Sequence, residues 1–461
     1  MMRSWSNRVW RRAADHPLAT IFLLALFIRL INLALLTGRD AFFAEQDTFA
    51  YWALGAALAK PDIFWPTLSS MTDRMPLYPL LLAGVQYAIG DGPRAVAFIQ
   101  SVIDAATCTF IASLGALISP RVGLIAGILA AFSTTLIVFS TQILTDTIFL
   151  FFFTLMLLAG AHFLLRPGIS RAIWAGLAGG LALVTRPAVA VLLAAAVPVI
   201  FVIALVQRRR LVWGLTAAMV FGVAAAAPVA PVLLRNAIQY DSLSLTSQIG
   251  DYWALWIVPL VVQRANGTPY QVTADRMESR YRERTERNSM AANNPFWRAA
   301  LKAELAREEM ARLPAGAYAS AWLEGMVVNL AAPAVLADPR VRALPKPSFY
   351  NTAGTSLWER ARTYLFHDPG LYQFLLVLGL LAMLPFLMLE AIGFVMLARR
   401  MPWAAVFAGA VLAYFLLLNG PVAAPRYRLP LEPVLLVLAA MPLARLTDRR
   451  QAYLIRSRML T

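Results

Sequence analysis

The sequence predicts an all-α polytopic membrane protein, and three observations lead to this fold class. Of its 461 residues, 60% are hydrophobic and the mean hydropathy is +0.64, whereas soluble domains are about 45–50% apolar. The apolar residues form blocks of roughly 20, the length that crosses a bilayer as a helix. Much of the net charge of +16 lies in short segments between these blocks, where it sets topology. A soluble globular enzyme is therefore excluded, and we expect no nucleic-acid partner.

The apolar blocks divide the chain into about ten to eleven predicted transmembrane helices. Region 172–206 is long enough to cross twice, because Thr185-Arg186-Pro187 marks a helix boundary inside it. Region 76–90 is short and contains Pro76, Pro79 and Gly84, so we expect it to stay at the membrane surface. The remaining blocks each have the length of one crossing: 17–37, 94–118, 121–140, 146–165, 211–234, 370–397, 402–420 and 428–445.

Loop charge predicts the orientation of these helices. Both termini and the connections that carry Arg121, Arg166, Arg171, Arg208–Arg210, Arg399 and Arg400 satisfy the positive-inside rule on the cytoplasmic side. The basic start of the chain precedes a first helix that we expect to be retained. We predict three modules: an N-terminal membrane module, 1–234, with an outer loop at 38–93; a largely helical outer segment, 235–367, with an amphipathic helix at 296–313; and the C-terminal helices, 368–461.

The first outer loop contains the most informative polar residues. Asp47 and Tyr51 are four residues apart and share one face if this stretch is helical. A carboxylate at the membrane surface suits a general base acting on a hydroxyl, although a solvated acid near a helix end has the same pattern. Arg74 lies in Asp73-Arg74-Met75-Pro76-Leu77-Tyr78 and suits either a phosphate or a lipid-headgroup contact.

Further polar residues fall at the same predicted depth, near the outer leaflet. Each has a simple structural explanation on its own, because Thr145-Asp146 can cap a helix and single arginines can be interfacial anchors. Together, two acids and several arginines at one depth suit a reaction on an anionic lipid headgroup. The set comprises Asp47, Arg74, Asp146, Arg186, Arg235, Arg426 and Arg428, and the adjacent Asn236 and Tyr427 are further predicted substrate contacts.

Ionisable residues also lie within predicted crossings. Arg29 and Asp104 are either functional or a structural ion pair. Glu390 and His162 lie nearer helix ends, and we expect them at the interface. The only cysteine, Cys108, rules out an internal disulfide and a cysteine-based metal site.

The order of the motifs resembles a known family. In sequence they resemble the bacterial GT-C glycosyltransferases of the family-39 type, which include relatives of protein O-mannosyltransferases and the aminoarabinose transferases that modify lipid A. The matching segments lie within residues 17–240 and 370–445. They are Asp47-x-x-x-Tyr51, Arg74-Met75-Pro76-Leu77-Tyr78-Pro79, Thr145-Asp146, Thr185-Arg186-Pro187, Pro231-Val232-Leu233-Leu234-Arg235-Asn236 and Arg426-Tyr427-Arg428-Leu429-Pro430.

The resemblance implies a GT-C-type bundle, a polyprenyl-phosphate-linked sugar donor and a reaction at the outer face of the membrane. It implies that Asp47 is the base, that Asp146 is the second acid and that Arg74 binds donor phosphate or sugar. It also implies that 76–90 is a juxtamembrane helix, with Tyr51 and Tyr78 among the substrate contacts. Two departures leave the acceptor open: Thr48 follows Asp47 where the aminoarabinose transferases have an acid, and no sizeable soluble domain follows the last crossing. We therefore expect 235–367 to recognise a lipid, glycan or protein acceptor.

The expected reaction is a single inverting displacement at the periplasmic face of a bacterial inner membrane. Asp47 would take the acceptor proton, and Arg74, Arg235 and Arg426 or Arg428 would stabilise the leaving polyprenyl phosphate. No metal is then required, although the acid-x-acid pattern Glu45-Gln46-Asp47 leaves room for a divalent cation. The alternatives are a transporter or flippase of a lipid-linked saccharide, and a polysaccharide polymerase or ligase.

Overall fold

The computed structural model describes residues 16–43, 46–207, 209–286, 293–346, 348–349, 352–354, 356–367 and 369–458, and all regular structure in these ranges is helical, as predicted. In the N-terminal part the helices are α2 (Pro17–Leu35), η1 (Asp40–Phe42), α3 (Gln46–Leu58), α4 (Phe64–Ser70), α5 (Leu77–Ile89), α6 (Pro93–Ala116), α7 (Pro120–Phe132), α8 (Thr134–Ser140), α9 (Asp146–Leu165), α10 (Ile169–Thr185), η2 (Pro187–Val189), α11 (Ala190–Val206), α12 (Leu211–Ala226) and α13 (Ala230–Tyr240).

The C-terminal part of the described chain continues with helices throughout. They are α14 (Ile249–Asp251), the π-helical η3 (Tyr252–Ile257), α15 (Val258–Asn266), α16 (Tyr270–Glu286), α17 (Pro295–Met310), α18 (Ala315–Ala331), η5 (Ala334–Ala337), α19 (Pro339–Arg342), α20 (Leu357–Phe366), α21 (Leu371–Arg400), α22 (Pro402–Asn419), η6 (Pro425–Leu431) and α23 (Glu432–Arg458).

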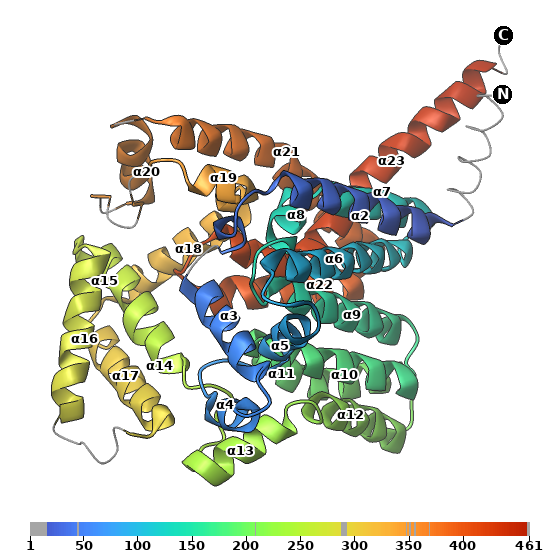
Figure 1. The fold of residues 1–461 in the computed structure, drawn as a ribbon. Helices are drawn as coiled ribbons and strands as arrows, with labels where there is room; N and C mark the ends of the chain where they lie inside the picture. The colour runs from blue at the N-terminus through green and yellow to red at the C-terminus, as the bar shows by residue number, and fades with distance from the viewer. Residues whose placement is uncertain are drawn as a thin grey trace.

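The long apolar helices form a bundle. Helices α2, α6, α9, α10 and α12 run side by side in Figure 1, and α21 packs on α23 at the other side of the same core. Close approach depends on small residues: a Cβ at Gly176 would lie 2.4 Å from the Phe221 carbonyl oxygen, and one at Gly180 would lie 2.4 Å from that of Ala225. Glycine at these two positions therefore lets α10 contact the α12 backbone.

The described residues contain seven helices that are long and apolar enough to cross a membrane, or nine if each of two bent pairs is one span. The predicted boundary at Thr185-Arg186-Pro187 is confirmed, because α10 ends at Thr185 and a new helix begins after Arg186. Helix α10 has 17 residues and would be a tenth crossing. Helix α5 has 13 residues, about 20 Å at 1.5 Å per residue, and is too short to span a core about 30 Å thick.

Two of the predicted crossings are bent. The segment predicted at 211–234 is α12 and α13, which meet at 63° where Pro228 and Pro231 interrupt the backbone hydrogen bonds. The segment predicted at 121–140 is α7 and α8, which meet at 50°. There the Ser133 side chain caps the second helix by accepting from the Leu136 N–H.

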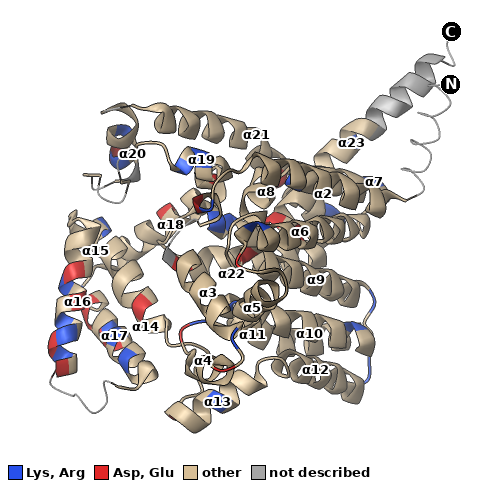
Figure 2. Ribbon diagram, viewed as in Figure 1, with Lys and Arg blue, Asp and Glu red and all other residues tan. Residues whose placement is uncertain are grey.

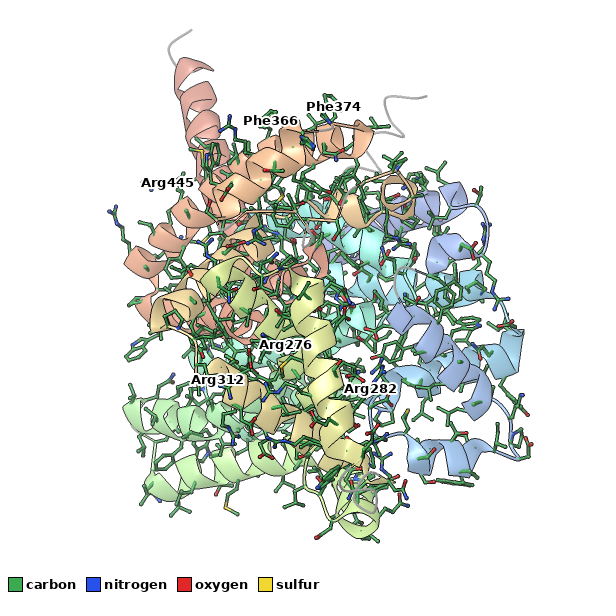
Figure 3. All side chains as sticks on the ribbon, turned by 90° about the vertical axis from the view of Figure 1, so that its left-hand side faces the viewer. Arg276, Arg282, Arg312, Phe366, Phe374 and Arg445 are labelled. Atoms are coloured by element: carbon green, nitrogen blue, oxygen red, sulfur yellow. The ribbon has the colours of Figure 1, made fainter. Side chains whose placement is uncertain are left out.

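The predicted outer segments gather at one end of the bundle. Helices α3 and α14–α18 lie on the left in Figure 1, whereas the turn between α9 and α10 lies on the right. The predicted amphipathic helix at 296–313 is α17, which packs against α16 through its apolar side. Figure 2 shows alternating positive and negative residues on α16, and Figure 3 shows Arg276 and Arg282 of this helix at the front. Arg276 bonds Glu309 of α17 at 2.6 Å.

The buried ionisable residues of the crossings form structural ion pairs. Arg29 Nε lies 2.6 Å from Asp104 Oδ2, and the remaining guanidinium nitrogens donate to backbone carbonyls that include Ala131 at 2.8 Å. Arg29 and Asp104 are almost completely buried. Every nitrogen of the guanidinium therefore has a partner in the folded protein, which supports the structural alternative.

The interfacial position expected for Glu390 is wrong. Its side chain is buried against Arg428, which also binds Glu432 at 2.8 Å. The helical sequence could not reveal this, because the partner charge comes from a segment 38 residues later.

Candidate active site

Asp47 lies in the first turn of α3, at the end of the bundle where the outer segments gather. Its carboxylate accepts a hydrogen bond of 2.7 Å from Arg74, which lies in the turn before α5. The Asp47 side chain is 42% exposed and the Arg74 side chain is 10% exposed. A reactant can therefore reach the carboxylate, whereas the guanidinium is fixed by its surroundings.

A second acid–base pair comes from two different crossings. Asp146 begins α9, and Arg186 follows the last residue of α10. The Arg186 guanidinium donates to the Asp146 carboxylate, whose side chain is buried. Thr145 makes no side-chain capping bond at this helix start. Asp146 therefore holds Arg186 in addition to beginning the helix.

Tyr51 lies between these two ion pairs. The Arg74 guanidinium lies over its ring at 5.3 Å, and Arg74, Arg186, Asp47 and Asp146 are all close enough to act on the phenol electrostatically. Burial raises the pKa of Tyr51 to about 12, an effect that the positive charge of Arg74 partly offsets. The phenol thus stays protonated at working pH and can donate a hydrogen bond.

The last outer turn brings a third arginine to the same place. Arg426 of η6 lies 4.0 Å from the second Asp47 carboxylate oxygen, and its guanidinium packs on the Tyr427 ring at 5.2 Å. Tyr252 is an electrostatic neighbour of Arg426 and Arg186, and burial raises its pKa above the usual range. We call the convergent set Asp47, Tyr51, Arg74, Asp146, Arg186, Tyr252, Arg426 and Tyr427 the polar cluster.

The arginines of the polar cluster can bind an anion. The cluster contains three guanidinium groups and two carboxylates, and a third carboxylate, that of Asp73, lies 3.4 Å from Arg74 at its edge. The Nε atom of Arg74 is buried without a hydrogen-bond partner. A phosphate oxygen would satisfy such a donor, and arginine binds phosphate through charge-assisted hydrogen bonds.

Arg428 lies outside the polar cluster. It is buried, and it donates to Glu390, Glu432 and the Leu330 carbonyl. Two carboxylates inside the bundle balance the charge of Arg428. We therefore infer that Arg428 holds η6 against α21 rather than binding a substrate. The contacts of Arg428 fix the position of η6, the helix that also carries Arg426.

Three other predicted substrate contacts also have partners inside the protein. Arg235 donates to the Leu68 carbonyl at 2.9 Å and to Asn236 at 2.7 Å, and the Asn236 amide donates to the Ser244 carbonyl. The Arg235–Leu68 bond connects α13 to α4, and the Asn236–Ser244 bond holds the loop that follows α13. Tyr78 is buried and donates to Gln100 at 2.8 Å, while its ring packs edge-on against Tyr51. Tyr78 thus supports Tyr51.

The sequence did not predict Tyr252 or Gln248 as site residues. The Gln248 amide lies against Arg74 and the Asp73 carbonyl, in the orientation that satisfies both groups. Tyr252 donates to the Asn419 carbonyl at 3.1 Å, which connects the 235–367 segment to the end of α22. Neither residue lies in a recognisable motif, so only the folded chain reveals them.

Among the described residues no group of three or more His, Cys, Asp or Glu side chains is placed to hold a metal ion. Glu45, which belonged to the predicted acid-x-acid pattern, lies outside the described residues. Asp47 and Asp146 are each held by an arginine.

Comparison with known protein families indicates the class of protein. Residues 73–234 match the family described as dolichyl-phosphate-mannose-protein mannosyltransferase. This range contains Arg74, Tyr78, Asp146 and Arg186, so the resemblance inferred from these motifs is confirmed over that part of the chain. No curated protein matches the sequence.

Among solved structures, one similar protein is ArnT from Cupriavidus metallidurans bound to undecaprenyl phosphate. The similarity covers 92% of this chain and 78% of that chain, at 14% sequence identity and a TM-score of 0.40. This score is too low to assign positions of one structure to the other.

Proposed function

We propose that this protein is an integral membrane glycosyltransferase that transfers a sugar from a polyprenyl-phosphate-linked donor to an acceptor hydroxyl. The proposal includes the periplasmic face of a bacterial inner membrane as the place of reaction. The apolar helices and the family match over residues 73–234 support a membrane glycosyltransferase. The excess of arginine in the predicted cytoplasmic connections supports the orientation.

The convergence of the polar cluster is the observation that carries the proposal. Asp47, Asp146, Arg186 and Arg426 lie far apart in the sequence, yet their side chains form adjacent ion pairs. Ion pairs that only stabilise a bundle lie inside it, as Arg29 and Asp104 do. Asp47 is instead partly exposed at the predicted outer end, where a lipid-linked substrate can reach it.

The geometry supports a single displacement with inversion. The acceptor oxygen attacks the anomeric carbon, and Asp47 takes the proton from that hydroxyl as the new bond forms. The bond between the anomeric carbon and the phosphate oxygen breaks at the same time, and its electron pair leaves with the polyprenyl phosphate. Arg74 and Arg426 stabilise the charge on the phosphate. Asp146 positions Arg186 beside Tyr51, whose phenol donates to the sugar or the phosphate.

The test uses purified protein in nanodiscs, radiolabelled polyprenyl-phosphate sugars as donors and a bacterial membrane lipid extract as acceptor. We expect label to appear on an acceptor in a donor-dependent manner. The anomeric configuration of the product should be opposite to that of the donor, as measured by NMR. Retention of configuration would contradict the single displacement.

The same preparation distinguishes the alternative functions. A flippase would move the lipid-linked sugar across a vesicle membrane without consuming it. A polymerase or ligase would consume a lipid diphosphate-linked glycan rather than a monophosphate-linked sugar. Either result, in the absence of transfer from the monophosphate donor, would overturn the proposal.

A further inference from the structure

A groove of about 1,120 Å³ lies between α21, α23 and the start of α7, at the end of the bundle opposite the polar cluster. In Figure 1 α7 and the last part of α23 lie on the right, whereas α14–α18 lie on the left. Loop charge predicts that this end is cytoplasmic. The groove therefore belongs to a different part of the molecule from the proposed reaction, which does not use it.

The groove begins beside the point where α21 and α23 touch. Gly393 packs against the backbone of Leu438, where a Cβ would overlap the carbonyl group. Pro442 lies four residues after Leu438 and cannot donate to that carbonyl, so the glycine meets a group that its own helix leaves unbonded. The part of α23 that lines the groove starts at Met441, three residues beyond this contact. The two helices are thus held at one point, and the groove separates them toward their ends.

The apolar part of the groove has the depth of one bilayer leaflet. Along α21 its lining extends from Leu389 to Arg400, which is about 16 Å at 1.5 Å per residue and about half of a core roughly 30 Å thick. Ile392 and Val395 are 47% and 48% exposed, so lipid can reach these walls from the side. An acyl chain of that leaflet fits along them. The apolar lining includes Leu389, Ile392, Val395, Met396, Met441 and Leu446.

Three arginines lie at the mouth of the groove. Arg399 and Arg400 belong to the last turn of α21, and Arg445 comes from α23. All three are exposed, and Figure 3 shows Arg445 at the edge of the molecule. Among the residues that the structure describes, the lining contains no acid. The mouth of the groove is therefore complementary to an anion, while its interior is complementary to an acyl chain.

Other basic residues at this end do not share this arrangement. Arginines here satisfy the positive-inside rule, and those in the last turn of a helix also interact favourably with its dipole. Both effects need charge, but neither needs a common groove. Arg166, Arg209 and Arg210 lie in connections of the same predicted side and are exposed as well, yet they are outside the lining. The three arginines of the mouth differ from them because they come from two helices and meet beside one apolar groove.

We propose that this groove binds an anionic phospholipid of the adjacent leaflet. The phosphate lies on Arg399, Arg400 and Arg445, and an acyl chain lies between α21 and α23. Basic pockets between helices on the cytoplasmic side of a membrane recognise such headgroups in this way. The bound lipid fills the space beyond the contact of Gly393 with Leu438 and so holds the two helices together. This inference does not depend on the proposed reaction.

The experiment compares lipid binding to the purified full chain and its variants by native mass spectrometry. The probes are phosphatidylglycerol, phosphatidylcholine with the same chains, and undecaprenyl phosphate. One variant replaces the three arginines of the mouth, Arg399, Arg400 and Arg445, with glutamine. The matched control replaces Arg166, Arg209 and Arg210 with glutamine, which changes the net charge by the same amount outside the groove.

A second pair of variants tests the apolar part of the groove. Val395→Trp fills the interior, and Val377→Trp is its control, a valine of the same helix that is 39% exposed and outside the lining. Thermal unfolding verifies that each variant is folded. Because all six substituted arginines are exposed, the arginine variants decide the question even where Val395→Trp does not fold.

We expect the wild type to prefer phosphatidylglycerol to phosphatidylcholine. One basic side chain near a lipid surface strengthens the binding of an anionic lipid about fivefold, so loss of the three arginines of the mouth should reduce the preference about 100-fold. The control triple variant should keep it. Val395→Trp should reduce bound phosphatidylglycerol about tenfold, because it displaces about two methylene groups of the chain, whereas Val377→Trp should not. All variants should bind undecaprenyl phosphate as the wild type does.

Four results would overturn the assignment. The first is a wild type that does not prefer phosphatidylglycerol. The second is equal loss in both arginine variants, which would show that only the overall charge matters. The third is equal binding of phosphatidylglycerol by the two folded tryptophan variants. The fourth is selective loss of undecaprenyl phosphate when the arginines of the mouth are replaced, which would assign the groove to the lipid carrier.

Discussion

Replacing Arg74 with glutamine tests the phosphate role of the polar cluster. Arg74 is 10% exposed, it donates to Asp47 at 2.7 Å, and its Nε atom is buried without a hydrogen-bond partner. A hydrogen bond to a charged group contributes about 1.5–3 kcal/mol. Loss of one such bond to the donor phosphate should weaken binding about 10- to 150-fold. The affinity of Arg74→Lys should fall between those of the wild type and Arg74→Gln, because lysine keeps the charge but lacks the planar guanidinium group.

The assay is a titration of each variant with undecaprenyl phosphate in detergent, together with the KM for the sugar donor. The matched control is Arg39→Gln, another arginine of the first outer loop, which pairs with Asp91 at 3.1 Å where both side chains are more than half exposed. Surface pairs contribute about 0–1 kcal/mol, so this variant should bind as the wild type does. Equal affinity of Arg74→Gln and wild type, or equal loss in both variants, would refute the reasoning.

Three further predictions concern the metal and the fold. Sugar transfer should persist in EDTA, because arginines stabilise the leaving phosphate; loss of activity that Mg²⁺ restores would contradict this. Asp104→Leu alone should lower the free energy of unfolding by about 3–5 kcal/mol, because it leaves Arg29 unpaired, and the double variant Arg29→Met with Asp104→Leu should recover much of this loss. Thermal unfolding measures both changes, and equal stability of the single and double variants would argue against a buried pair. Gly176→Ala should destabilise the protein by about 1–3 kcal/mol, because its Cβ would lie 2.4 Å from the Phe221 carbonyl oxygen. In the control Gly222→Ala the Cβ would meet the Val197 side chain at 3.8 Å, so this variant should be neutral or stabilising. The reverse order of unfolding temperatures would show that the packing is different.

The helical fold followed directly from the sequence. Apolar blocks of bilayer length have one stable solution in lipid, because every backbone polar group must be bonded within its own helix. Bends were harder to predict. Pro228 and Pro231 were visible in the sequence, but the 63° angle between α12 and α13 depends on how the bundle packs.

The candidate site could be predicted in part. The shared depth of Asp47, Arg74, Asp146, Arg186 and Arg426 predicts a common site, and the structure brings their charged groups together. Shared depth could not separate Arg428 from Arg426, although the two are two residues apart in one turn. The difference arises because Glu390 and Glu432 bind Arg428 inside the bundle. Such a pairing depends on packing between α21 and α23, which no local pattern reveals.

The middle of the chain was the least predictable region. Tyr252 lies in an apolar π-helical turn and Arg360 lies in the amphipathic helix α20, and neither pattern identifies the partner of the residue. Arg360 contacts Glu324 across 36 residues. Because long-range charge pairs of this kind are specified by tertiary contacts, only the folded chain reveals them.

The rate of sugar transfer by Asp47→Asn, measured at saturating donor and acceptor, tests the central claim most directly. Asp62→Asn is the control, an exposed acid of the same loop. If Asp47 is the base, Asp47→Asn should bind undecaprenyl phosphate but lose about 10²- to 10⁴-fold in rate, while Asp62→Asn should transfer at the wild-type rate. An Asp47→Asn variant that turns over as fast as the wild type would contradict the account.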